Sequence, residues 1–329
     1  MSADKPSMVK IAKKADVSAM TVSRVLNGSP NVAAETRNRI LRIASEMGYS
    51  HIPNAMSRIL RGERSRSIGI LTCFARPHLS GEVLKSIGDE LFPTDYVTYI
   101  VDTYADPVVV LRSLQTLAER RTDGVIYFSH TPGDVNEEII ALLRKIGCFV
   151  IISHDDLPET LPGICCGWTP GIRHALEFFR RKGRRRPVLL KESANRSCVR
   201  AFEKACTELG FAERRVATLQ AEEVFSAFAG EMPGDCLICS SEKYRIPVSE
   251  LTDQGRKLPI VMLMDDFLIS QVAPAYPVLR RREPEAGKMA AKILLDQMEN
   301  GRPVSGTLRL PMEFIENIGW KNSFQAKGQ

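Results

Sequence analysis

Apolar residues recur at helical spacing in three short stretches near the N-terminus. The first stripe consists of Val9, Ile11, Ala12 and Ala15. Ser18 then stands where a second helix, residues 19–26, needs an N-cap. The third stretch, residues 35–47, carries its apolar face on Ile40, Leu41, Ile43, Ala44 and Met47. Two short helices around a tight turn, braced by a third, predict a helix-turn-helix, although a three-helix bundle without a ligand has the same pattern.

From residue 67 onward, short apolar runs alternate with amphipathic stretches. Strands are expected at residues 67–72, 97–101, 124–128, 148–153, 187–190, 236–239 and 260–264. Helices are expected at residues 79–92, 108–121, 135–146, 172–182, 195–209 and 284–299. This alternation predicts parallel sheets with helices on both faces. It restarts after a proline-containing break at residues 157–163, so we expect two doubly wound units with a ligand cleft between them.

These patterns divide the chain into three parts. Residues 1–52 are expected to form an all-α head, residues 53–66 a hinge helix and linker, and residues 67–329 an α/β bilobed core. The first lobe is expected at about residues 67–157 plus 285–303, and the second at about residues 158–284 plus 304–329.

The net charge of +6 is concentrated in the head. Residues 1–66 carry 12 basic and 5 acidic side chains, whereas the remainder carries 33 basic and 34 acidic ones. A basic module on a nearly neutral body indicates a polyanion partner for that module, with a solvated basic tail as the alternative. The arginine run at residues 184–186 is interpreted as a solvated loop.

The segment VSAMTVSRVLN, residues 17–27, resembles the V-S-x-x-T-V-S-R-V-L-N signature of the lactose-repressor (LacI/GalR) family. The motifs E-T-R at residues 35–37, G-Y at 48–49 and P-N at 53–54 continue that resemblance. In the core, S-I-G-I-L at residues 67–71, T-D-G-V-I at 122–126 and M-D-D at 264–266 are similar to further family motifs. The resemblance implies a helix-turn-helix head on a periplasmic-binding-protein-like core of type I, with two doubly wound parallel sheets.

The family's DNA contacts can be transferred onto matching positions. The resemblance implies DNA-binding roles for Ser18, Ala19, Met20, Thr21, Ser23, Arg24, Asn27, Asn54, Ser57 and Leu60. Ala19 and Met20 would read bases through apolar contacts, and Arg24 through polar ones, whereas Leu60 would wedge into the minor groove. Ala33 departs from the family's usual serine N-cap, which we expect to cost about 1 kcal/mol of local stability. Two heads reading two half-sites of a double-stranded, pseudo-palindromic operator predict a homodimer.

The effector site is less well defined by the resemblance. Its expected residues are Cys73, Arg76, His78, His154, Arg196, Cys198, Ser241 and Asp265. Only Asp265 keeps the family's residue type, and Cys198 stands where many relatives have a ligand-binding arginine. Arg76, His78 and His154 would suit an anionic ligand such as a sugar acid or sugar phosphate, with exposed loop residues as the alternative interpretation. The expected effector is a sugar, sugar acid or sugar phosphate. A regulator without a small-molecule effector, or one controlled by a partner protein, remains the alternative.

Other protein classes are not supported by the sequence. No nucleotide-binding glycine motif, phosphate-loop, zinc-protease or nucleophile-elbow motif is present, so an enzyme is not expected. A solute-binding protein would need an export signal, which the N-terminus lacks, and no apolar run is long enough for a membrane span. We therefore expect a cytoplasmic regulator without a cofactor. Its eight cysteines are expected to be reduced and structural rather than metal ligands.

Overall fold

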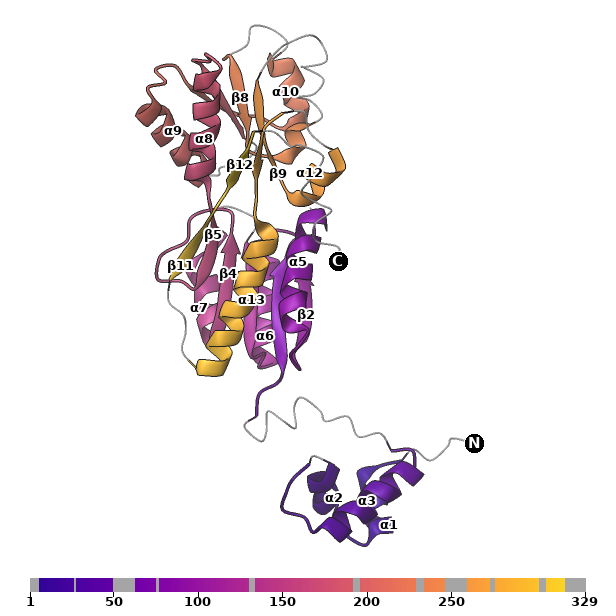
Figure 1. Cartoon of the computed structure of the whole chain (residues 1–329). Helices are drawn as coiled ribbons and strands as arrows, with labels where there is room; N and C mark the ends of the chain where they lie inside the picture. The colour runs from indigo at the N-terminus through magenta and orange to yellow at the C-terminus, as the bar shows by residue number, and fades with distance from the viewer. Residues whose placement is uncertain are drawn as a thin grey trace. The chain divides into compact units, whose positions relative to one another are not determined.

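The structure is a computed structural model. It describes residues 6–26, 28–49, 63–74, 77–129, 134–191, 196–228, 234–245, 259–272, 276–301 and 306–316. The chain forms two compact units, Met1–Ser65 and Arg66–Gln329, which we call the head and the core (Figure 1). No described helix is both long and apolar enough to cross a membrane.

The head contains three helices, α1 (Met8–Ala15), α2 (Ala19–Leu26) and α3 (Ala34–Glu46). Asp16 adopts a left-handed conformation (φ 49°) and ends α1. The predicted N-cap of α2 is confirmed, because the hydroxyl of Ser18 accepts the backbone N–H of Thr21 at 3.1 Å. The three helices close around a small apolar core, whose fully buried members are Ile11, Ala12, Ala15, Val22, Val25, Ile40, Ile43 and Ala44.

The sequence-based prediction of this core is wrong for two apolar residues. Val9 is 69% exposed and Leu41 is 45% exposed. The buried stripe on each helix includes only some of the helix's apolar residues. Met8, in the first turn of α1, is partly buried against the core. The missing cap of α3 is observed directly, because Ala33 holds the N-cap position without a side-chain hydrogen bond.

The first lobe of the core is a six-stranded parallel sheet in the order β11-β5-β4-β3-β1-β2. Its strands are β1 (Ser67–Thr72), β2 (Val97–Asp102), β3 (Gly124–Ser129), β4 (Cys148–Ser153), β5 (Gly163–Gly167) and β11 (Thr307–Pro311). Helices α5 (Pro77–Leu91) and α13 (Glu283–Asn300) cover one face, and α6 (Pro107–Glu119) and α7 (Glu137–Ile146) cover the other.

The second lobe is another six-stranded sheet, in the order β12-β10-β9-β8-β6-β7. Five strands run parallel: β6 (Pro187–Lys191), β7 (Arg215–Thr218), β8 (Cys236–Cys239), β9 (Ile260–Met264) and β10 (Val278–Arg280). The sixth, β12 (Glu313–Ile315), pairs antiparallel with β10. Helices α8 (Trp168–Arg181) and α9 (Arg196–Leu209) pack on one face, and α10 (Ala221–Phe228), the 3₁₀ helix η1 (Glu242–Tyr244) and α12 (Asp266–Val272) on the other. The predicted fold class, two doubly wound sheets beside a helical head, is confirmed.

The chain crosses between the lobes three times, and this corrects the predicted lobe boundaries. Strands β5 and β11 belong to the first sheet, although the sequence placed both segments in the second lobe. The crossings therefore join β5 to α8, β10 to α13 and β11 to β12, and Figure 1 shows β11 running almost directly into β12. The first and third crossings lie together, since the backbone N–H of Met312 donates to the carbonyl of Gly167 at 3.0 Å.

Helix α13 returns from the second lobe and fixes the first one. A Cβ atom at Gly287 would lie 2.2 Å from the hydroxyl oxygen of Ser86 and 2.8 Å from the carbonyl oxygen of Val83, so only glycine lets α13 approach α5 so closely. Further along α13, the fully buried amide of Gln297 bonds both backbone groups of Phe149 in β4. These contacts hold the start of α13, at the junction of the lobes, in a fixed place.

Candidate functional site

Helix α2 presents a polar and apolar face to solvent. Its side chains Val22 and Val25 are buried in the head core, whereas Ala19, Met20 and Arg24 are exposed. Met20 is apolar but 65% exposed, so it does not contribute to the core of the head. The sequence-predicted Ser18, Thr21 and Ser23 flank this face, and the hydroxyls of Ser18 and Thr21 lie 2.9 Å apart.

This face has the chemistry of a major-groove surface. A short helix with small residues at its start can bring its first turn close to base edges, where a thioether contacts thymine methyl groups and a guanidinium reads guanine. No acidic residue lies on α2, and Lys13 and Lys14 on the neighbouring α1 are exposed. The remaining predicted DNA contacts, Asn27, Asn54, Ser57 and Leu60, lie outside the described residues.

A second polar concentration lies where the lobes meet. Most of the parallel strands in both sheets end on a buried polar residue or within two residues of one. Thr72, Ser129 and Ser153 close β1, β3 and β4, whereas Thr103, Ser241, Asp265 and Arg281 follow β2, β8, β9 and β10. Since the carboxyl ends of parallel strands share one edge of a sheet, these groups converge on the junction of the lobes.

The centre of the junction holds a buried ion pair. The Nε atom of Arg281, directly after β10, lies 3.0 Å from Oε1 of Glu283, the first residue of α13. Their side chains are only 4% and 3% exposed. His154, after β4 of the first lobe, places Nε2 3.8 Å from the same carboxylate oxygen and stacks on Phe128 with ring centroids 5.2 Å apart. A charged pair in this position joins the second lobe to the first.

The predicted effector residues are divided between this region and other places. His154 and Asp265 lie at the junction, and Asp265 accepts the N–H of Leu268 at 2.7 Å. Ser241 is buried and accepts the N–H of Lys243 at 3.3 Å, while Cys73 is buried directly after β1. Arg196 is exposed at the start of α9. His78 is the second residue of α5, and Arg76 lies outside the described residues.

Cys198 does not face the junction. It is fully buried among the apolar side chains of α8, α9 and the second sheet, and burial raises the pKa of its thiol well above the ordinary value. A neutral thiol in this position packs as a small hydrophobe. We therefore leave Cys198 out of the proposed effector site.

A charged network closes another side of the junction. The Asp156 carboxylate, in the loop after β4, pairs with Arg309 of β11 and with Arg200 of α9, and so links the two lobes. Burial alone would raise the pKa of Asp156, but the two guanidinium groups outweigh it and hold this pKa below its usual range. The N–H of Ser197 donates to Asp155 at 3.2 Å, and the indole of Trp168 donates to the carbonyl of His154 at 3.1 Å.

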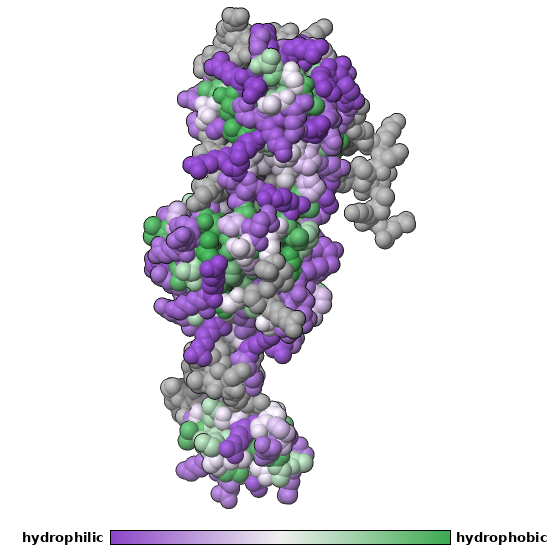
Figure 2. Space-filling model, turned by 90° about the vertical axis from the view of Figure 1, so that its left-hand side faces the viewer, coloured by the Kyte–Doolittle hydropathy of each residue, from purple (hydrophilic) through white to green (hydrophobic). Residues whose placement is uncertain are grey.

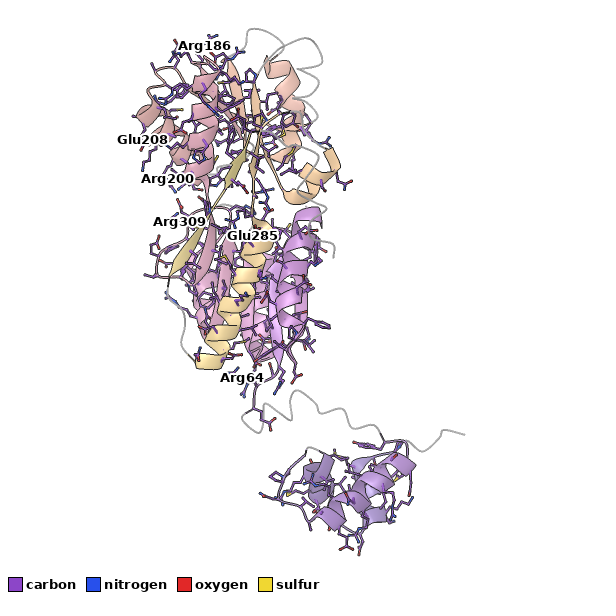
Figure 3. All side chains as sticks on the ribbon, in the orientation of Figure 1. Arg64, Arg186, Arg200, Glu208, Glu285 and Arg309 are labelled. Carbon is purple, nitrogen blue, oxygen red and sulfur yellow. The ribbon has the colours of Figure 1, made fainter. Side chains whose placement is uncertain are left out.

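A pocket of about 550 Å³ opens beside this network. Its walls include Trp168, Arg200, Lys204 and Arg309, and Figure 3 shows Arg200 and Arg309 on either side of the junction. None of the effector residues predicted from sequence lines it.

Sequence reasoning missed the charged residues that organise the junction. Arg281 and Glu283 lie in the run RRREPE, residues 280–285, whose density of charge at the end of a short strand was the available signal. Asp156 and Arg309 could not be paired, because the position of β11 in the first sheet was not foreseen. In the described part of the chain, no three His, Cys, Asp or Glu side chains converge as metal ligands would. Free thiols occur at Cys73, Cys148, Cys165, Cys198, Cys206, Cys236 and Cys239.

Comparison with known proteins agrees with these features. Residues 7–54 match the family described as "Bacterial regulatory proteins, lacI family". The chain is 24% identical over 308 residues to the transcriptional repressor PurR of Haemophilus influenzae, covering 88% of this chain and 90% of PurR. It is 25% identical over 331 residues to the transcriptional regulator RegA of Clostridium saccharobutylicum, covering 94% and 98%.

The same fold occurs in a solved repressor. The lac repressor dimer bound to operator and the anti-inducer ONPF superposes with a TM-score of 0.74 and 19% identity, covering 95% of this chain and 98% of that one. At this identity the match establishes the architecture of head and bilobed core, and the residue roles depend on the chain's own side chains.

The buried ion pair makes a stability prediction. Glu283→Gln leaves the Arg281 guanidinium buried without its counter-charge, so we expect the free energy of unfolding to fall by about 3–5 kcal/mol in urea denaturation. The double variant Arg281→Met, Glu283→Leu removes both charges and should regain most of this loss. Asp89→Asn, in an exposed pair with Lys85, is the control and should leave the midpoint unchanged. A double variant as unstable as the single one would contradict this account.

Proposed function

We propose that this chain is a member of the lacI family of bacterial regulatory proteins and that it represses transcription as an operator-bound homodimer whose DNA affinity is set by an effector at the lobe junction. It is a DNA-binding regulator and not an enzyme. The DNA-binding part of the proposal rests on the exposed face of α2. Met20 and Arg24 are exposed on this helix, whereas Val22 and Val25 are buried in the core of the head. Acting on DNA places the protein in the cytoplasm.

Recognition by α2 rests on two kinds of contact. Met20 and Ala19 offer only apolar surface, so they favour steps with thymine methyl groups. Arg24 is the exposed side chain on α2 that can donate two hydrogen bonds to one base. The basic side chains around this helix supply phosphate contacts, which raise affinity for every sequence.

We expect Arg24→Ala to remove sequence discrimination. The loss of a bidentate base contact should reduce the preference for genomic fragments selected by the wild-type protein, relative to scrambled duplexes, by about 1–3 kcal/mol. Lys13→Ala, on the exposed side of α1, is the matched control: it should leave the ratio between the two duplexes unchanged even if total affinity falls. Fluorescence anisotropy measures both constants. An Arg24→Ala protein with the wild-type ratio would exclude Arg24 from base readout.

The effector part of the proposal rests on the polar strand ends. His154, Ser241 and Asp265 offer groups that match the hydroxyls of a sugar, sugar acid or sugar phosphate. Because the junction is held by charges from both lobes, a ligand that binds one lobe arrangement more tightly than another shifts the relation between them. Relatives in the comparison include a ribose operon repressor of Haemophilus influenzae.

The test is a panel of sugars, sugar acids and sugar phosphates, scored by their effect on DNA binding of the full chain. A compound that changes the affinity should lose at least about tenfold of its potency against Asp265→Asn, because the carboxylate that accepts ligand hydroxyls is gone. Asparagine keeps the cap on Leu268, so the fold is retained. Asp89→Asn is the control. If no compound acts, or if Asp265→Asn responds as the wild type does, control without this effector site is the better description.

The first lobe offers a surface for the homodimer. Strand β2 is an edge strand of its sheet, and Val97, Tyr99 and Ile100 on it are 63%, 39% and 50% exposed. Tyr104 and Val108, which follow β2, are more than 70% exposed. An apolar edge strand left in water is a liability that a second copy of the chain would cover.

Ile100→Asp should therefore convert the protein to a monomer, because a carboxylate would be buried without a partner in the dimer. Analytical ultracentrifugation of the full chain measures the shift. Leu308→Asp is the matched control, since Leu308 is 47% exposed on β11, the opposite edge strand of the same sheet. The proposed interface fails if Ile100→Asp stays dimeric, or if Leu308→Asp dissociates instead.

A further inference from the structure

The second lobe carries a dense cluster of positive charge that the proposed function does not use. Residues 180–186, RRKGRRR, contain six basic residues and one glycine, and we call this segment the basic turn. It connects the end of α8 to the start of β6. Figure 3 shows Arg186 at the outer end of the second lobe, away from the junction.

The backbone of the basic turn is held in place. Gly183 takes a left-handed conformation (φ 73°), and the N–H of Arg184 donates to the carbonyl of Phe179 at 3.0 Å. The carboxylate of Asp235 accepts the backbone N–H groups of Arg185 and Arg186 at 2.8 and 2.9 Å. The cations are therefore displayed from a fixed support, which lowers the entropy lost on binding a partner.

The charge of the basic turn is only partly compensated. Arg181 pairs with Glu316 at 2.6 Å, and Asp235 lies beside the turn. Arg180, Arg185 and Arg186 are exposed, and their side chains form no ion pair with a carboxylate of the described residues. Arg215, also exposed, adds a further cation at the start of β7, the neighbour of β6.

The surroundings of the basic turn favour a nucleic acid over a protein. The large hydrophobic side chains that are exposed in the described residues all lie in the head or the first lobe, and none lies in the second lobe. Figure 2 shows that the face of the second lobe turned to the viewer is mostly hydrophilic. A protein interface needs an apolar core, whereas a DNA backbone needs only positive charge at suitable spacing.

The basic turn lies far along the core from Arg66, the residue at which the core joins the head. Strand β6 begins at the basic turn, and the strands parallel to it in the second sheet run in the same direction and end at the junction. The parallel strands of the first sheet also end there. Arg66, where the core joins the head, precedes β1 and so lies at the beginning of the first-sheet strands. The basic turn and Arg66 are therefore at opposite ends of the core.

We propose that the basic turn binds the phosphate backbone of a second DNA duplex while the head holds the first, so that the protein bridges two DNA segments. Binding is independent of sequence, because arginine side chains on a turn reach phosphates rather than base edges. It decreases steeply with salt as counterions return to the DNA.

The test is a capture experiment with the full chain. The protein is loaded on bead-bound random-sequence DNA, and a fluorescent 40-base-pair duplex of unrelated sequence is then added at low salt. The triple variant Arg180→Gln, Arg185→Gln, Arg186→Gln removes exposed cations and spares Arg181, which pairs with Glu316. We expect its capture of the second duplex to fall at least about tenfold while its affinity for a single duplex is unchanged.

The matched control removes the same charge from the first lobe, through Arg112→Gln, Arg144→Gln and Lys145→Gln, all exposed. It should capture the second duplex as the wild type does, and thermal melts of both variants check that the fold is intact. The proposal is overturned if the triple variant of the basic turn captures the second duplex as well as the wild type does. It is also overturned if the first-lobe control loses as much capture as that triple variant. Displacement of the second duplex by polyglutamate as readily as by unlabelled DNA overturns it in favour of an acidic protein partner.

Discussion

The direction of the strands is the constraint on which the core depends. Parallel strands place all their carboxyl ends at one edge of a sheet, and both sheets turn that edge toward the other lobe. The polar residues that end these strands are consequently gathered at the junction, while the strand interiors stay apolar. The chain then has to cross the junction three times, and the second crossing runs between Arg281 and Glu283. In the described residues, the lobes are thus joined by covalent crossings and by charge, and their apolar clusters are separate.

Charge at a junction has a different consequence from apolar packing. A buried ion pair contributes little net stability, because the cost of desolvating both groups nearly equals their attraction, but it strongly disfavours arrangements that separate them. Arg281 with Glu283 therefore defines a preferred lobe arrangement more than it strengthens the fold. Small differences in how a ligand satisfies such groups are enough to favour another arrangement, which is the property that an effector-controlled core requires.

How much of the fold could be predicted from sequence depended on how apolar each strand is. The strands at residues 148–153, 236–239 and 260–264 were placed as observed, because continuous apolar runs are bounded there by polar residues. The strands β5, β7, β10, β11 and β12 are short and mix apolar residues with polar, glycine or proline residues, so they were missed. That omission moved two strands into the wrong lobe and hid the pairing of Asp156 with Arg309. The DNA-binding residues of the head could be predicted because most of them lie within one continuous segment, whereas the junction is assembled from segments more than a hundred residues apart.

The exposed fraction of each apolar side chain could not be predicted from the sequence alone. Hydrophobicity alone placed Val9 and Leu41 inside the head, yet both are largely in water, and only the packing of three helices separates them from Ile11 and Ile40. For Met20 the exposed fraction is informative in another way. The sequence pattern alone does not show whether an apolar residue outside the core has no role or contacts a partner. In the described residues, the large exposed apolar side chains of the core lie on the first lobe, and the densest run of basic residues, the basic turn, lies on the second. Exposed apolar surface favours a protein partner and clustered positive charge favours DNA, so we propose a second copy of the chain as the partner of the first lobe and DNA as the partner of the basic turn.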